Sequence, residues 1–439
     1  MSSVLPRLSA LALAFLLVSG CGGGSGGNIG GGGGGGGTST TVNVTFTGGT
    51  PSAVATQIGS GAFTAVSPSG TLTLTLPSGT TTFAVAFLCQ GAVYAETDAY
   101  QTVEEATTAD GTSFTWPCFA PISTGSTGTL SFDVDSSAIP NDSTVEIEAL
   151  NGDYSSELGL GEPFSFQAPV GSDTVEILAY GGGSVPVSEV LFAAKIFTDQ
   201  TVPGSLNGGA TVVLGPADET TMQSITYSNA PGVASVPESN VVFCPTGAVN
   251  SNFCIEDALN ATSQFSVLPG SATPTGGTYF VQAADGYQYS GNSGSGNNLV
   301  WAATSTSGGA PVALTFPAPW PTFTPTPAAL PTLSTAYSGF AGKTDVSQSG
   351  SFFWSPTMTS VDVYSMTASE NYQNGSISIT FPNLSTIPGF LPLPASGASI
   401  SWFVSVEQGS IPNAAGVPPL NTPIPSVQAV SNSGAYDVP

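Results

Sequence analysis

The stretch TLTLTLPSGTTTFAVAF, residues 71–87, decides the fold class of this chain. Large apolar side chains recur at every second position on each side of a central Pro-Ser-Gly: Leu72, Leu74, Leu76, Phe83, Val85 and Phe87. A two-residue period places these side chains on one face of a β-strand, and proline with glycine marks a turn. The stretch therefore predicts two half-buried strands joined by a tight turn.

The same arrangement recurs further along the chain. VATQIGSGAF at 54–63 aligns with VEIEALNGDY at 145–154, and a second Pro-x-Gly at 169–171 precedes another alternating run, as at 77–79. The spacing between the copies is about 91 residues. Matches in the same order predict a repeated β-sandwich domain. The alternative is that unrelated β domains share a Pro-x-Gly turn.

A strand, a Pro-x-Gly turn and another alternating strand resemble the Ig-like or transthyretin-like modules found in tandem on bacterial surface proteins. The resemblance covers residues 40–214 and implies spacers, stalks or adhesive units. We therefore expect an all-β chain of tandem Ig-like or transthyretin-like sandwiches behind a flexible glycine-rich tether. Residues 103–109 are the best local candidate for a short helix.

Composition divides the chain into seven predicted segments. They are a signal peptide (1–20), a lipidated cysteine with a glycine-rich tether (21–38), β-sandwich 1 (39–122), β-sandwich 2 (123–214), β domain 3 (215–316), a proline-rich linker (317–333) and β domain 4 (334–439). The tether cannot bury a core and should behave as a flexible coil. Whether 215–439 forms two domains or one larger one stays open.

The N-terminal residues carry a second resemblance. Arg7 precedes a short apolar run at 10–18, which ends in Val18-Ser19-Gly20-Cys21. The run is too short to span a bilayer. This pattern resembles the signal peptide and lipobox of a bacterial lipoprotein, which implies cleavage before Cys21 and acylation, with palmitate-type chains, of that cysteine. Gly22 occupies the position at which an aspartate would retain such a lipoprotein at the inner membrane. The resemblance therefore implies sorting to the outer membrane. The alternative for Cys21 is a buried or disulfide-bonded cysteine after a secretory signal.

The charge of the chain restricts its partners. Three Lys and Arg stand against 28 Asp and Glu, a formal net charge of -25, and only Lys195 and Lys343 remain after the predicted cleavage. Binding of nucleic acid needs clustered cations and is excluded. Anionic lipid would repel the chain, so the membrane partner must be held through the lipid anchor. Charged residues make up only 7% of the chain, which suggests adaptation to an acidic exterior. The alternative is a composition bias of the whole lineage.

The absence of histidine removes most hydrolase mechanisms, including the Ser-His-Asp and Cys-His arrangements. We predict no enzyme activity and no cofactor. Two carboxylates suffice for glycoside hydrolysis, so a polysaccharide-binding lipoprotein or a glycosidase is the alternative. Close acidic pairs are Glu96 and Asp98, Glu104 and Glu105, Asp133 and Asp135, Glu146 and Glu148, and Glu256 and Asp257.

Four cysteines besides Cys21 predict disulfides in an exported chain. We prefer Cys89 with Cys118 and Cys244 with Cys254, because each bridge then stays inside one predicted domain. Thiolate metal binding is the alternative, although no CxxC pair accompanies these cysteines.

Two further binding sites are considered. Tyr287, Tyr289 and Trp301 flank a predicted hairpin loop and could stack on sugar rings; the alternative is that they are core or cross-strand aromatics. Asp133, Asp135 and Asp142 could contribute to a calcium site, with ordinary turn chemistry as the alternative. We therefore expect an adhesive or structural envelope protein whose partner is an envelope or extracellular polysaccharide or protein.

Overall fold

The computed structural model is all-β, as predicted, with only two short helical segments among the residues that it describes, η1 (Leu206–Gly209) and α2 (Glu370–Gln373). No helix in this described part is long and apolar enough to cross a bilayer. The described part is residues 39–439 without 91–98, 119–126, 136, 139–143, 150–153, 159–163, 182–189, 231–237, 246–254, 261–262, 271, 273–276, 286–296, 308, 322–323, 344, 358–359, 374–375 and 410–426.

The first unit is a sandwich of sheets β4-β1-β7 and β3-β2-β5-β6. Its strands are β1 (Thr40–Thr47), β2 (Ala53–Ile58), β3 (Thr64–Val66), β4 (Thr71–Leu76), β5 (Thr82–Gln90), β6 (Ala99–Thr107) and β7 (Ser113–Pro117). The predicted turn between β4 and β5 is present: Thr80 N donates to Pro77 O at 3.0 Å, and Gly79 has φ +82°, as a type II turn requires. It connects the two sheets rather than two paired strands.

The core of the first unit lies between its two sheets. The alternating side chains of β1 and β4 are buried against those of β5, and Phe87 stacks with Trp116 of β7 with ring centroids 6.2 Å apart. Burying these large rings removes apolar surface from water, the main favourable contribution to folding. The alternation in the sequence therefore encodes this core directly.

The second unit repeats the strand order of the first. Its sheets are β12-β8-β15, with the short pair β16-β9, and β11-β10-β13-β14. The strands are β8 (Thr127–Phe132), β9 (Val134–Asp135), β10 (Thr144–Ala149), β11 (Tyr154–Leu158), β12 (Phe164–Pro169), β13 (Gly171–Gly181), β14 (Val190–Val202), β15 (Gly204–Ser205) and β16 (Val212–Val213). In both units the first strand pairs in parallel with a strand near the end of the unit, β1 with β7 and β8 with β15. The predicted repeat is therefore present in the topology.

Two further units follow: the third has the same order, and the fourth keeps it without a counterpart of β7 among the described residues. The third has sheets β20-β17-β23 and β19-β18-β21-β22, and the fourth has β24-β27 and β26-β25-β28-β29. The strands are β17 (Thr221–Ser228), β18 (Glu238–Pro245), β19 (Ile255–Asn260), β20 (Gln264–Val267), β21 (Gly277–Asp285), β22 (Asn297–Ser307), β23 (Val312–Thr315), β24 (Thr332–Ser334), β25 (Val346–Thr357), β26 (Ser360–Ser369), β27 (Ser378–Thr380), β28 (Ser399–Gln408) and β29 (Val427–Asp437).

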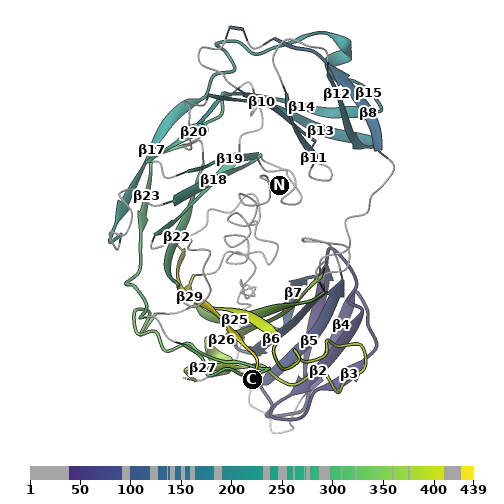
Figure 1. Ribbon diagram of the computed structural model, residues 1–439, viewed down its shortest axis with the longest axis vertical. Helices are drawn as coiled ribbons and strands as arrows, with labels where there is room; N and C mark the ends of the chain where they lie inside the picture. The colour runs from purple at the N-terminus through teal and green to yellow at the C-terminus, as the bar shows by residue number, and fades with distance from the viewer. Residues whose placement is uncertain are drawn as a thin grey trace, which may run out of the picture.

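Three of the units share one twelve-stranded sheet. Its order is β19-β18-β21-β22-β29-β28-β25-β26-β6-β5-β2-β3. The third unit joins the fourth through antiparallel β22 and β29, and the fourth joins the first through parallel β26 and β6. The units consequently follow an arc in the order first, fourth, third, second (Figure 1). Strand pairing rather than chain order sets this arrangement.

The sheet of the first unit is covered on both faces. One face of β5 contributes Phe83, Val85 and Phe87 to the unit's own core, and the other contributes Ala84 and Ala86 to a core shared with the fourth unit. Residues 387–391, which precede β28, lie on this second face. A Cβ on Gly389 would stand 3.1 Å from the Cβ of Ala53. Small residues at both positions allow this close approach.

Candidate functional site at the junction of the first and last units

We call the pairing of β6 with β26, together with the side chains that bridge these units beside it, the seam. Seven residue pairs are in parallel register, from Ala99 opposite Asp362 to Glu105 opposite Ala368. The prediction of a short helix at 103–109 was wrong, because β6 extends to Thr107. Pairing with β5 on one side and β26 on the other overrides the local helical preference.

Side-chain hydrogen bonds cross the seam on both faces of the sheet. The hydroxyl oxygens of Thr102 and Ser365, which lie opposite each other, are 3.0 Å apart. On the other face the Leu391 amide donates to Gln101 Oε1 at 2.9 Å, and both residues are buried. These bonds satisfy polar groups that the joining of the two units removes from water.

Asp110 closes the end of the seam just after β6. Its Oδ2 accepts hydrogen bonds from the Thr107 amide at 2.7 Å and from the Ser369 hydroxyl at 2.6 Å. Its Oδ1 accepts one from Asn371 Nδ2 at 2.6 Å. The carboxyl group of the first unit thus receives donors from two residues of the fourth unit. Such bonds to an ionised acceptor are stronger than those between neutral groups.

Glu104 and Glu105 lie near the same end of β6. Adjacent residues of a strand point to opposite faces, so Glu104 shares the face of Ala106 and Glu105 that of Val103. Burial raises the pKa of Glu104 to about 8, with a smaller contribution from the charge of Glu105. Burial also raises the pKa of Glu105 to about 7, although a hydrogen bond with Tyr372 opposes this effect.

Tyr372, on α2 of the fourth unit, links Glu105 to the first unit's β2. Its hydroxyl lies 3.4 Å from Gln57 Oε1 and also contacts the Glu105 carboxyl. One hydroxyl carries one proton, so it can donate to only one of these two acceptors at a time. A protonated Glu105 can instead donate to the Tyr372 oxygen, which leaves the tyrosine proton for Gln57. The geometry therefore accommodates a neutral carboxylic acid at Glu105, with both hydrogen bonds formed.

Glu407 is another buried acid on the same sheet. It lies on β28, opposite Ser347 of β25 and Ala429 of β29, and 5% of its surface is exposed. Within the described part of the chain its Oε1 has no hydrogen-bond partner. Burial raises its pKa to about 8. Two residues away on the same face, the Ser405 and Ser349 hydroxyls are 2.6 Å apart.

The arrangement of these acids bears on the chemistry available. Glycoside hydrolysis needs two carboxyl groups that flank one bond. Glu104 and Glu105 lie on opposite faces of the sheet, so they do not face one substrate together. What the seam offers is a set of carboxylic acids whose protonation alters the contact between two units.

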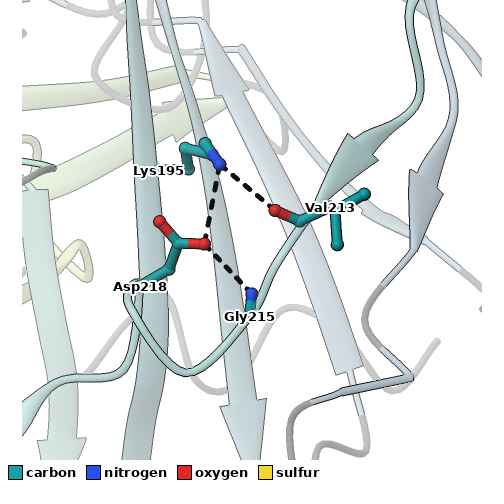
Figure 2. Close-up of polar contacts among 4 residues, drawn as sticks. All are labelled: Lys195, Val213, Gly215 and Asp218. Atoms are coloured by element: carbon teal, nitrogen blue, oxygen red, sulfur yellow. Dashed lines mark hydrogen bonds and ion pairs between the residues drawn. The ribbon is translucent and has the colours of Figure 1, made fainter.

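A different contact joins the second unit to the third (Figure 2). Lys195 Nζ, on β14, lies 3.5 Å from Asp218 Oδ2 and donates to the Val213 carbonyl at 3.2 Å. The Gly215 amide donates to the same Asp218 oxygen at 3.0 Å. The Ala194 amide donates to Asp218 O at 3.1 Å. We call this group of residues the β14 contact. It uses one of the two lysines that the sequence analysis singled out.

The cysteine predictions have different outcomes. Cys89 and Cys118 form the predicted disulfide, with their Cα atoms 5.5 Å apart, and both are buried at the edge of the first core. Cys244 lies in β18, but Cys254 lies outside the described residues, so their pairing stays a prediction. Cys21 and the whole tether also lie outside the described residues.

The predicted glycan site requires a correction at Trp301. This residue lies in β22 with 1% of its surface exposed, packed among Ala284, Val427 and Ala429. Its ring cannot stack on a sugar in this position, so Trp301 takes the core role that the sequence left open. Tyr287 and Tyr289 lie outside the described residues.

The aspartates considered for calcium make ordinary turn contacts. Asp133 Oδ2 accepts a hydrogen bond from the Thr211 hydroxyl at 2.8 Å, and Asp135 Oδ1 accepts one from the Ser137 amide at 3.0 Å. Hydrogen bonds from the Ser137 hydroxyl and amide lower the pKa of Asp135. Asp142 lies outside the described residues, and no group of three acidic or cysteine side chains within them could hold a metal ion.

Comparison with known proteins shows little similarity. No family model and no curated protein matches this chain. The Bacillus anthracis TIE protein, whose structure is solved, has 13% sequence identity to this chain and a TM-score of 0.15. The match covers 63% of this chain and 50% of the TIE chain. The match therefore spans half the length of that protein.

Two other solved structures are similar at the same level. A Ca2+-stabilized adhesin with which an Antarctic bacterium binds ice is 13% identical over 91% of this chain and 99% of its own, with a TM-score of 0.14. A streptococcal ancillary pilin is 8% identical over 63% of this chain and 99% of its own, with a TM-score of 0.13. TM-scores this low carry no argument about function.

Proposed function

We propose that this protein is a lipid-anchored, non-catalytic protein of the bacterial cell envelope with a structural or adhesive role. The observation that carries the proposal is the twelve-stranded sheet, which joins three β-sandwich units edge to edge. Inter-unit contacts made by strand pairing resist bending, whereas ordinary linkers leave neighbouring domains free to move. A stiff scaffold of this kind suits a protein that projects from a surface.

The sequence supplies the other supports. The lipobox-like Val18-Ser19-Gly20-Cys21 and the glycine-rich tether fit an anchor followed by a flexible spacer. Two or more acyl chains give stable membrane attachment without a spanning segment. The absence of histidine removes the commonest catalytic base.

The anchor is tested by expressing the full chain in a bacterium with two membranes and determining the mass of its N-terminal peptide from the membrane fraction. We expect a peptide that starts at Cys21 and carries diacylglycerol with an amide-linked acyl chain. Cys21→Ser is the matched control and should leave the chain uncleaved or soluble. An unmodified thiol at position 21, or an intact chain in the cytosol, contradicts the anchor.

The role at the surface is tested separately. Cells that display the protein should lose it to added protease and should bind an abiotic or host surface more than cells with the Cys21→Ser variant. The purified chain should release no sugar from a panel of polysaccharides. Steady hydrolysis of any of them would favour the glycosidase, and saturable binding without hydrolysis would identify a polysaccharide as the adhesive partner.

A further inference from the structure

The seam joins parts of the chain that are far apart in sequence. Thr102 and Ser365, which face each other across it, are separated by 263 residues. The fourth unit is already held to the third by β29 and β22, so the seam is what attaches the first unit to the rest of the twelve-stranded sheet. Loss of the β6–β26 pairing, together with separation of the apolar contacts between β5 and residues 387–391, would therefore release the first unit from the arc.

The seam is rich in acids and poor in bases. β6 contributes Glu104 and Glu105, the following turn contributes Asp110, and the fourth unit contributes Asp362 on β26 and Glu370 on α2. The other ionisable groups there are three tyrosines, Tyr100 on β6, Tyr364 on β26 and Tyr372 on α2. β2, β5, β7, β25 and residues 382–398 add no ionisable side chain besides the disulfide-bonded Cys89. Among the described residues, the one ion pair is that of Lys195 with Asp218, in the β14 contact.

We propose that the seam is a proton-dependent closure: it holds the first unit against the fourth while Glu104 and Glu105 are protonated, and releases it when both are ionised.

The physical reason is the cost of ionising both acids in this position. Two adjacent carboxylates on one buried strand would repel each other and the nearby Asp110 without any cation to offset them. Opening the seam turns β6 into an edge strand and lets water reach the carboxylates. The raised pKa values of Glu104 and Glu105, about 8 and about 7, place the change between neutral and mildly alkaline pH.

The tyrosines favour the same direction of change. Burial raises the pKa of Tyr364 and of Tyr372, and the charge of Glu105 raises both further. Both phenols therefore stay neutral throughout this pH range and add no charge of their own.

The test uses the chain from residue 21 with Cys21→Ser, which lacks the predicted lipid. Small-angle X-ray scattering at pH 5 and pH 9 should show a compact arc at pH 5 and a radius of gyration larger by about a tenth at pH 9, because a released unit extends the molecule. The Glu104→Gln, Glu105→Gln double variant should stay compact at pH 9. Glu370→Gln, which changes an exposed acid beside the seam, should open like the wild type.

A second variant keeps the test decisive if the glutamine variant folds poorly. Thr102→Cys with Ser365→Cys places two thiols where the hydroxyls are 3.0 Å apart. Once oxidised, this variant should stay compact at pH 9 and should open there after reduction. Scattering that is the same at pH 5 and pH 9 for the wild type, or an oxidised variant that expands as the wild type does, would overturn the proposal.

Discussion

The seam and the β14 contact both hold one sandwich unit against another, but they do so by different physical means. The seam has seven residue pairs, the buried Glu104 beside the partly exposed Glu105, and the Asp110 carboxyl group, which accepts hydrogen bonds from both units. The β14 contact has a single β-bridge, between Ala193 and Glu219, and an ion pair whose lysine is 36% exposed. The free energy of the seam therefore depends on backbone pairing and protonation, whereas the ion pair of the β14 contact depends on screened charge beside the buried Leu178, Leu191 and Ala194.

The largest difference should appear when the backbone of the seam is broken. Met366→Pro in the middle of β26 removes a ladder donor from a central strand, which should cost about 3 kcal/mol or more. In chemical denaturation, we expect the first unit to unfold in a separate step from the fourth. Met366→Leu, which keeps the backbone donor and fills a similar volume, should unfold like the wild type. If the proline variant unfolded in the same transition as the wild type, the seam would contribute little to the stability of the first unit.

The second prediction concerns pH. Because the folded-state pKa values of Glu104 and Glu105 are above the ordinary value of 4.5, the folded chain binds more protons than the unfolded chain between about pH 4.5 and 8. Their stabilising contribution is fully present below pH 4.5 and is lost as the pH rises through 7 and 8. We expect an effect on the order of 3 kcal/mol, after allowing for relaxation and water penetration.

Melting temperature measured from pH 5 to pH 9 checks this prediction. It should fall across the range in the wild type and change much less in the Glu104→Gln, Glu105→Gln variant. The same measurement tests the acidic-exterior hypothesis, which requires maximum stability on the acid side. A maximum at neutral pH or above would contradict both.

The individual units and the contacts between them differ in how far the sequence predicts them. The alternation at 71–87 predicted β4, β5 and their turn correctly, because one face of each strand packs into the core of its own unit. The prediction that both strands are half-buried was wrong for β5, whose other face is buried against the fourth unit. The aligned copies predicted the repeat for the same reason, since a shared core imposes a shared pattern. Local patterns thus predicted the individual units.

The arrangement of the units could not be read in this way. β6 carries the sequence VEEAT, which favours helix locally, and its partner β26 lies 263 residues away. No periodicity encodes the pairing of two such strands. One feature of the sequence could have indicated it: residues 83–89 are continuously apolar, as expected for a strand that is buried on both faces. Such a run indicates that a further part of the protein packs on the second face of β5. Glu104 and Glu105 were noted as a pair, but their burial depends on that unpredicted cover.

The third prediction isolates the polar end of the seam. Asp110→Ala leaves Ser369, Asn371 and the Thr107 amide without their shared acceptor, which should cost about 2 kcal/mol. Asp110→Asn keeps one acceptor oxygen and should cost less. Hydrogen exchange of residues 360–369 is the measurement, because loss of this bridge should raise exchange at the end of β26 nearest α2. If hydrogen exchange rose to the same extent in all four units, the substitution would have caused a general loss of stability instead.

The smallest effect should come from the β14 contact. Lys195→Met removes the ammonium group that lies 3.5 Å from Asp218 and keeps most of the apolar stem, so we expect a loss of about 0.5 kcal/mol. The loss should be seen at low ionic strength and disappear at high salt, since the lysine is exposed and screened. Chemical denaturation of the wild type, Lys195→Met, Asp218→Asn and the double variant gives the coupling between the two charges. A loss of several kcal/mol that salt does not change would mean that this contact is buried like the seam, and the distinction between the two joints would fail.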